Sequence, residues 1–386
     1  MKPTEFDIVV TTIFSPEWLL GYLENFEKYD ACDKVTLRII CDKKTPKEVY
    51  AAAAQAQQMG FHIDCPSLDE QADYLKKLGL PADFIPWNSD NRRNIGFLRA
   101  WEHGARALIS IDDDNYCLQG ESFIDAHGIV GSATTTLPGS AMLASQAPWY
   151  NVCENLHAEN CASFYARGFP YAARGASERA TLEPLGSTDR RVAVNAGLWT
   201  DDPDVDAATR LVQGPRVISA NSTAVLLDTP TWSPINTQNT ALIRDAIPAY
   251  YYVRMGFPIQ GMRIDRYGDI LSGYFLQKCV KHLGDAICFG SPIAEHRRSP
   301  HNLFQDLYHE LAGKVIVEDL LPWLQGLKLQ ASTYTEAYAV LADELELQAS
   351  RMHGFIWDQG GQEFLRETAQ MMRVWLKTLA RIEGAA

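Results

Sequence analysis

The segment Ala107-Leu-Ile-Ser-Ile-Asp-Asp-Asp114 places three carboxylates directly after a short apolar run. Residues 107–111 have the length and composition of a buried strand. Asp112 and Asp114 lie two positions apart, so their side chains point the same way in extended backbone. Clustered carboxylates repel one another unless a cation lies between them, and oxygen ligands suit Mg²⁺ or Mn²⁺. The segment therefore predicts a strand that ends in a divalent-metal site, with a solvated acidic loop as the alternative.

Strand-like and helix-like segments alternate through the first third of the chain. Residues 7–13, 35–41 and 61–65 are further short β-rich runs. Between them, Ser15-Pro16-Glu17, Thr45-Pro-Lys-Glu48 and Ser67-x-x-Glu70 are helix-start signals, the last two as capping boxes. This order predicts an α/β fold with a Rossmann-type, mostly parallel sheet and helices on both faces. Ligands of such sheets bind outside the carboxyl ends of the strands, where the acidic segment falls.

Composition and charge argue against several classes of function. The formal net charge of −13 and the pI near 5.2 disfavour a broad nucleic-acid or anionic-membrane surface. The first apolar run follows Glu5 and Asp7 and is too short for a signal peptide or a membrane span. Eight cysteines without a C-x-x-C pair are typical of free thiols in a reducing compartment. We therefore expect a cytoplasmic protein that has no membrane span and no nucleic-acid partner.

We expect the chain to divide into a large domain and a helical appendage. Residues 120–310 are rich in Gly, Pro, Asn and Arg, whereas residues 334–352 and 363–382 have helical composition. These patterns predict a catalytic domain over residues 1–315 and a C-terminal helical segment over residues 316–386 that packs on it. They leave the oligomeric state open, a homo-oligomer included.

Further polar side chains fall near the predicted carboxyl ends of strands. Arg93 could neutralise a pyrophosphate or order a base, or it could lie on an exposed helix face. Asp42 follows the second strand and could accept hydrogen bonds from a nucleoside, or it could be a turn residue. Together with Thr12 and Asp113, these two residues form the predicted nucleotide-binding set.

Several ordered segments resemble one family, the plant reversibly glycosylated polypeptides, also known as UDP-arabinopyranose mutases. The run Gly197-Leu-Trp-Thr-Asp-Asp-Pro-Asp-Val-Asp-Ala-Ala-Thr-Arg-Leu-Val212 is similar to the family's G-L-W-x-x-x-P-D-x-D-A-x-T-x-L-V. Ser110-Ile-Asp-Asp-Asp114 resembles its acidic metal motif, and Arg266-Tyr-Gly-Asp269 resembles its R-Y-D-D. The resemblance covers about residues 6 to 325. It implies a GT-A-type glycosyltransferase-like fold, a UDP-sugar ligand and a divalent metal, Mn²⁺ or Mg²⁺.

The resemblance also implies a pair of arginines, which match Arg167 and Arg174 at the same separation. In the family the first arginine becomes reversibly glycosylated, which gives that role to Arg167. The chemical alternative is that both arginines hold the diphosphate, because a guanidinium is a poor nucleophile. Asp269 is the predicted general base, or the stabiliser of positive charge on the sugar. His296 is the predicted third metal ligand beside Asp112 and Asp114, with a structural histidine as the alternative.

Three departures from the family pattern are expected to face the sugar or acceptor. Asn195-Ala-Gly replaces Ser-His-Gly, Gly268 replaces the first acid of R-Y-D-D, and Thr237-Gln-Asn239 replaces Cys-Gly-Met-Asn. The predicted sugar or acceptor set consists of Asn195, Asn239 and Trp199. Trp199 could stack on the apolar face of the sugar, or it could be a tryptophan of the hydrophobic core.

These departures shorten or remove side chains, so they predict an open acceptor side. We therefore expect transfer of a sugar from UDP to a small-molecule, glycan or polypeptide acceptor. The alternatives are a UDP-arabinopyranose mutase and a non-catalytic nucleotide-sugar-binding partner in polysaccharide synthesis. A nucleotidyltransferase needs a Gly-rich phosphate loop after the first strand, and Ile13-Phe-Ser-Pro16 is not one.

Overall fold

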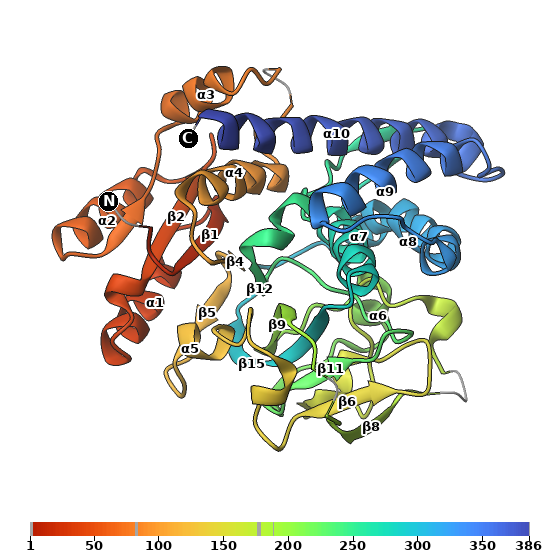
Figure 1. Ribbon diagram of the computed structural model, residues 1–386, viewed down its shortest axis with the longest axis horizontal. Helices are drawn as coiled ribbons and strands as arrows, with labels where there is room; N and C mark the ends of the chain where they lie inside the picture. Colours follow the sequence, from red (N-terminus) through yellow and green to blue (C-terminus); the bar gives the residue numbers. More distant parts are fainter. Residues whose placement is uncertain (1–2, 82–83, 176–178, 188, 386) are drawn as a thin grey trace.

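A large sheet runs through the computed structural model, which describes residues 3–81, 84–175, 179–187 and 189–385 (Figure 1). Its main strands lie in the order β3-β2-β1-β4-β12-β9-β15-β11-β6-β8. Their bounds are β1 Phe6–Thr12, β2 Val35–Cys41, β3 His62–Asp64, β4 Ala107–Asp112, β6 Met142–Ser145, β8 Thr181–Pro184, β9 Val192–Asp201, β11 Val225–Leu227, β12 Asn239–Ile243 and β15 Ala286–His296. Of the short strands, β5 Asn115–Cys117 pairs with β15, and β10 Val217–Ala220 pairs with β9 and with β7 Leu156–Ala158. β13 Phe257–Ile259 pairs with β14 Met262–Ile264 separately.

The first half of the sheet is parallel and buried on both faces. β1 pairs in parallel with β2 and β4, and β2 pairs in parallel with β3. Successive residues of a strand point to opposite faces, yet Ile8, Val9 and Val10 are all fully buried. Beyond β4 the pairing is mixed, because β12 runs antiparallel to both β4 and β9, whereas β15 runs parallel to β9.

Helices cover the sheet, and the last ones pack against each other (Figure 1). Their bounds are α1 Glu17–Lys28, α2 Lys47–Gln58, α3 Leu68–Lys77, α4 Arg93–His103, α5 Phe123–His127, α6 Ala207–Gln213, α7 Gly268–His282, α8 Leu303–Gly326, α9 Tyr334–Ala349 and α10 Gln362–Ala385. α10 packs along α9 and reaches back to the end of α3, where Arg381 Nη1 donates to the Leu78 carbonyl at 2.8 Å. Within the described ranges, no helix is long and apolar enough to span a membrane.

The predicted fold class is confirmed: the protein is α/β, with helices packed on its sheet and a C-terminal run of helices. Residue 315, the predicted domain boundary, lies inside α8. The Ser67–Glu70 capping box forms as predicted. The one predicted at Thr45 does not form: the Thr45 hydroxyl accepts instead from Asp42 N at 2.7 Å, and it donates to the Thr12 carbonyl at 2.5 Å, which ties this turn to the end of β1.

Close packing between α4 and the sheet depends on Gly96. A Cβ atom at this position would lie 2.2 Å from Val9 Cγ1 and 3.2 Å from Ile40 Cγ1. We expect Gly96→Ala to lower the free energy of unfolding by about 1–3 kcal/mol, although alanine favours helix over glycine by about 1 kcal/mol. Urea unfolding measures the change. Gly120→Ala is the control, because a Cβ atom there meets nothing within 4 Å. Equal losses in both variants would remove the packing explanation.

Candidate active site

A cavity of about 410 Å³ lies at the carboxyl ends of β1, β2 and β4. We call it the main cavity. It collects side chains from every part of the chain up to the loop after β15, as the order of the α/β sheet predicts. Nine of the residues predicted from the sequence line it: Thr12, Asp42, Arg93, Asp112, Asp113, Asp114, Arg167, Asp269 and His296.

The acidic segment after β4 is held by a buried arginine. Arg93 pairs with the Asp112 carboxylate and donates to Ser110 Oγ at 2.6 Å and to the Ile111 carbonyl at 2.8 Å. Burial, together with the negative charges of neighbouring carboxylates, nevertheless raises the pKa of Asp112 to about 7. The Asp112 carboxylate therefore needs more positive charge than Arg93 supplies to stay fully ionised at neutral pH.

Asp113, the middle acid, points to the turn after β1. Its Oδ2 accepts from the backbone N–H groups of Ile13 at 3.1 Å and Phe14 at 3.4 Å. Burial raises the pKa of Asp113 to about 6. Asp42 also accepts from backbone groups, Lys43 N at 2.7 Å and Ser89 N at 3.3 Å. Both carboxylates therefore shape loops of the main cavity, besides lining it.

Asp114 and His296 lie next to each other on the wall of the main cavity. His296 Nδ1 lies 2.5 Å from the Asp202 carbonyl, so this nitrogen carries the proton and donates. His296 Nε2 then faces Asp114 Oδ2 at 3.2 Å, and two acceptors at this distance need a proton or a cation between them. Burial would lower the pKa of His296, but the hydrogen bond and charge of Asp114 raise it. Burial would raise the pKa of Asp114, but the hydrogen bond and charge of His296 hold it below its usual value.

The chemistry of these donors fits a divalent cation. Metal-ligating histidines commonly donate their other nitrogen to a backbone carbonyl, as His296 does. Two carboxylates and an imidazole suit Mn²⁺ or Mg²⁺. Among the residues the structure describes, no three His, Cys, Asp or Glu side chains converge as a ready ligand set, and the Asp112 carboxylate is paired with Arg93. Metal ligation by these residues therefore stays a prediction.

A buried ion-pair cluster centres on Arg167. Its Nε and Nη2 donate to Asp204 at 2.8 and 3.0 Å, and its Nη1 and Nη2 donate to Asp269 at 3.0 and 2.5 Å. The remaining Nη1 hydrogen bond goes to the Arg266 carbonyl at 2.7 Å. Burial would lower the pKa of Arg167, but the two carboxylates raise it well above its usual value. All five N–H donors of this guanidinium are thus engaged within the protein.

A family model for the reversibly glycosylated polypeptides matches residues 1–383. The chain belongs to the reversibly glycosylated polypeptide family. UDP-arabinopyranose mutase 1 of Oryza sativa subsp. japonica is 25% identical over 346 residues, which covers 88% of this chain and 83% of the relative. UDP-arabinopyranose mutase 1 of Arabidopsis thaliana is 26% identical over 344 residues, with 88% and 84% covered.

This member of the family is also similar in structure to two solved proteins. Glucosyl-3-phosphoglycerate synthase from Mycobacterium tuberculosis, in complex with Mn²⁺ and UDP-glucose, aligns with a TM-score of 0.38 at 10% identity, over 82% of this chain and 79% of that one. S. aureus TarS 1–349, in complex with UDP-GlcNAc, aligns with a TM-score of 0.38 at 13% identity, over 99% and 81%.

The second arginine of the reversibly glycosylated polypeptide pair lies outside the main cavity lining. Arg174 Nη2 donates to Asp206 Oδ2 at 2.5 Å, and its guanidinium stacks on the Tyr171 ring, 3.8 Å from the centroid. Asp206 also caps α6 by accepting from Thr209 N at 2.9 Å. The structure therefore does not bring Arg174 together with Arg167 on one wall of this cavity.

The predicted sugar or acceptor residues are buried elsewhere. Trp199 is in the hydrophobic core. Asn195 Nδ2 lies 3.1 Å from His127 Nδ1, and Asn239 Oδ1 lies 2.9 Å from His127 Nε2. Burial lowers the pKa of this histidine to about 4, so it is neutral and accepts from Asn195 while donating to Asn239. None of these four side chains lines the main cavity.

Gly268 is also a packing position in this member of the family. A Cβ atom there would lie 2.5 Å from the Val253 carbonyl oxygen and 2.9 Å from Tyr252 Cε1. The acidic side chain that the family resemblance leads us to expect here would not fit this backbone. Of the departures from the family pattern, only Thr237 and Gln238 reach the main cavity.

The structure adds cavity residues that sequence reasoning did not select. They are chiefly Asp90, Asp204, Arg210, Tyr252, Arg266 and Arg298. Asp204 and Arg266 lie inside the family-like motifs, so the motifs themselves were a usable signal. Asp90 and Tyr252 carry no local signal, because only the folding of distant loops brings them to the cavity.

Asp204 should make folding stability depend on acid pH. Burial would raise its pKa, but the charge and hydrogen bonds of Arg167, with Asn236, hold it at about 2. The unfolded value is about 3.9, so the stabilisation is present above about pH 4 and is lost as pH falls through about 2. We expect a loss of about 2–3 kcal/mol in the free energy of unfolding from this residue. Urea unfolding at several pH values should show a shallower acid fall in Asp204→Asn than in the wild type. An unchanged slope would contradict the assignment, and Asp73→Asn, exposed on α3, controls for the removal of one charge.

Proposed function

We propose that this protein is a UDP-sugar mutase that interconverts the pyranose and furanose forms of a UDP-pentose, with UDP-arabinose as the first substrate to test. The carrying observation is that Arg167 and Asp269, from two separate family motifs, form an ion pair on the wall of the cavity that Asp112, Asp114 and His296 also line. Family membership and relatives named as UDP-arabinopyranose mutases support the same choice.

The departures from the family pattern do not favour transfer to an acceptor. Transfer was expected because Asn195, Asn239 and Gly268 would open one side of the sugar site. Asn195 and Asn239 instead hydrogen-bond to the buried His127, and Gly268 is packed against a backbone carbonyl. With that argument removed, the mutase is the better interpretation.

Ring interconversion requires that the anomeric C–O bond to UDP break and re-form while both fragments stay bound. Between these two events O4 of the sugar bonds to C1, the C1–O5 ring bond breaks, and the proton of the O4 hydroxyl passes to O5. A divalent cation held by Asp112, Asp114 and His296 would supply positive charge to balance the UDP diphosphate. Asp269 provides the carboxylate that stabilises positive charge on the sugar, and Arg167 fixes its orientation through two hydrogen bonds. Arg93 holds the acidic turn through its ion pair with Asp112.

Arg167 acts in this proposal as a positioning residue. Its five N–H groups are engaged by Asp204, Asp269 and the Arg266 carbonyl, and its raised pKa keeps it fully protonated. A protonated guanidinium has no free lone pair with which to attack the sugar. Intact-mass measurement after incubation with UDP-arabinose should therefore find no pentose adduct on Arg167.

The direct test of function is incubation of the purified protein with UDP-arabinopyranose and Mn²⁺, followed by chromatographic separation of the two ring forms. We expect UDP-arabinofuranose to appear without release of free UDP. Release of UDP that depends on an added glycan or polypeptide acceptor would indicate a transferase instead. Absence of both reactions, with UDP-sugar binding intact in calorimetry, would indicate a binding protein.

A further inference from the structure

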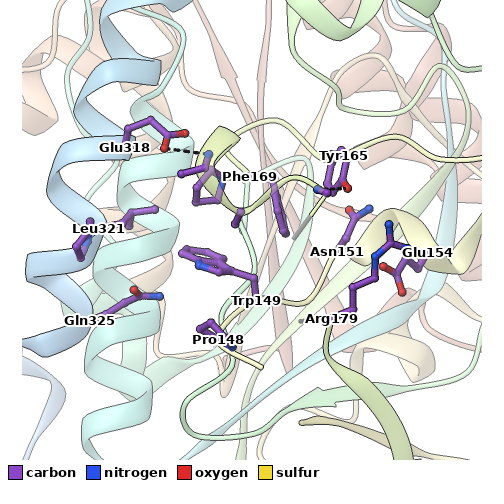
Figure 2. Close-up of a pocket in the computed structure, with 15 residues that line it drawn as sticks. Pro148, Trp149, Asn151, Glu154, Tyr165, Phe169, Arg179, Glu318, Leu321 and Gln325 are labelled. Carbon is purple, nitrogen blue, oxygen red and sulfur yellow. Dashed lines mark hydrogen bonds between the residues drawn. The ribbon is translucent and has the colours of Figure 1, made fainter. Parts of the chain in front are cut away.

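A second cavity, of about 300 Å³, lies apart from the residues that carry the proposed function. Its centre is aromatic: Trp149 meets Phe169 edge to face with centroids 5.7 Å apart, and Tyr165 lies 5.0 Å from Phe169. Figure 2 shows these rings in the middle of the second cavity, with polar side chains on both sides of them. The volume falls at the lower end of small-ligand pockets, which span about 300–1,000 Å³.

The polar groups of the second cavity come from separate elements. Glu318 and Gln325 reach it from α8, and Asn151 and Glu154 reach it from the loop after β6. Figure 2 shows Glu318 and Gln325 on one side of Trp149, and Asn151 and Glu154 on the other. An aromatic centre with hydrogen-bonding groups around it matches a saccharide ring, which has C–H faces and hydroxyls at its edge.

The arrangement is less suited to an organic cation. An aromatic cage for a cation needs rings that stand apart to enclose it, whereas Trp149 and Phe169 are in contact with each other. Glu318 is already bound to the backbone N–H groups of Tyr171 and Ala172. A neutral ligand with hydroxyl groups therefore fits better than a positive one.

One segment, residues 164–175, separates the two cavities. Tyr165 and Phe169 face the second cavity, whereas Arg167, between them, faces the main cavity. Gly168 makes this reversal, since its φ of +88° is one that L side chains rarely adopt, and Tyr274 Oη donates to its carbonyl at 3.0 Å. The two cavities are therefore neighbours that share a wall.

We propose that the second cavity binds a saccharide ring other than the sugar of the nucleotide, such as a residue of a glycan chain. The inference goes beyond the proposed function, and none of the residues assigned to that function lines this cavity. It makes the protein a two-site sugar binder, with the second site against the segment that carries Arg167.

Saturation-transfer NMR on the full chain tests whether the second cavity binds a saccharide. The probes are methyl glycosides of glucose, galactose and arabinose, N-acetylglucosamine, and tetramethylammonium as the competing chemistry. Ala172→Trp fills the second cavity from an exposed lining position, and Ala54→Trp, on the exposed side of α2, is its matched control. We expect transfer to the ring C–H protons of at least one saccharide in the wild type and the control, reduced by about tenfold or more in Ala172→Trp.

Two further readings keep the outcome unambiguous. Thermal unfolding should be similar for both tryptophan variants, so that lost transfer reports a filled cavity and not a lost fold. Equal transfer in Ala172→Trp would place the sugar elsewhere and overturn the proposal, as would transfer to tetramethylammonium alone or to no probe. The proposed function fails by a different result, the absence of UDP-sugar turnover, so the two can be told apart.

Discussion

Asp269→Asn should reduce ring interconversion by about a thousandfold while it leaves UDP-sugar affinity within a few-fold of the wild type. The carboxylate is buried at the first turn of α7 and is held by two hydrogen bonds from Arg167. An amide of the same size cannot balance positive charge that develops on the sugar, but it removes no group assigned to the nucleotide. Turnover measured under saturating substrate, with calorimetry for binding, separates the two effects.

Two comparisons sharpen this expectation. Asp265→Asn removes a carboxylate four residues earlier that does not line the main cavity, and it should leave turnover unchanged. Arg167→Lys keeps one positive charge but cannot reproduce the paired hydrogen bonds to Asp204 and Asp269. We expect it to lower kcat with little change in KM. Near wild-type turnover in Asp269→Asn would exclude this residue from the chemistry.

The double variant Asp112→Asn/Asp114→Asn should abolish the dependence of UDP binding on Mn²⁺. We expect the wild type to bind UDP about a hundredfold more tightly with Mn²⁺ than with a chelator, and the variant to bind equally in both. The fold should persist, because burial and neighbouring acids raise the pKa of Asp112 to about 7 and Asn carries no charge to bury. Arg93 keeps its hydrogen bonds to Ser110 and the Ile111 carbonyl. Calorimetry with and without metal gives the answer.

The third acid of the segment supplies the matched control. Asp113→Asn removes one carboxylate from the same turn, but the Asp113 carboxylate is bound to Ile13 N and Phe14 N. This variant should retain the Mn²⁺ dependence. If it loses that dependence as fully as the double variant, the effect comes from the charge of the whole cluster and not from specific ligands.

Local sequence patterns were sufficient for the first half of the fold. β1, β2 and β4 each contain an unbroken apolar run, so their burial and parallel order follow from strand length and the intervening helices. Local sequence patterns do not predict the strands of the second half of the sheet. β15 contains Gly290 and Pro292, which interrupt the alternation expected of a strand, and its partner β9 lies nearly a hundred residues earlier.

The candidate site also has one part that the sequence predicts and one part that it does not. Asp112, Asp114 and Asp42 reach the main cavity because strand ends of a parallel sheet meet at one edge, which the sequence alone predicts. The partners of Arg167 could not be predicted, since Asp204 and Asp269 approach it only through tertiary folding. The resemblance placed Arg167 in the site but gave no reason to expect it inside an ion-pair cluster.

Asn195 and Asn239 show the limit of reasoning from departures alone. Each replaces part of a family motif, so both were expected beside the sugar. They are instead joined through His127, a residue with no motif of its own. A substitution in a motif can therefore record how the interior is packed in this member of the family and carry no information on the substrate.

Positional isotope exchange tests the central claim most directly, namely that the anomeric C–O bond breaks and UDP recaptures the sugar within one closed site. UDP-arabinopyranose carrying ¹⁸O in the bridge between C1 and the β-phosphorus is incubated with the protein, and ³¹P NMR follows the label. The account predicts that ¹⁸O moves into the non-bridging positions of the β-phosphate at least as fast as the furanose form appears. Formation of UDP-arabinofuranose with the label retained entirely in the bridge would contradict it.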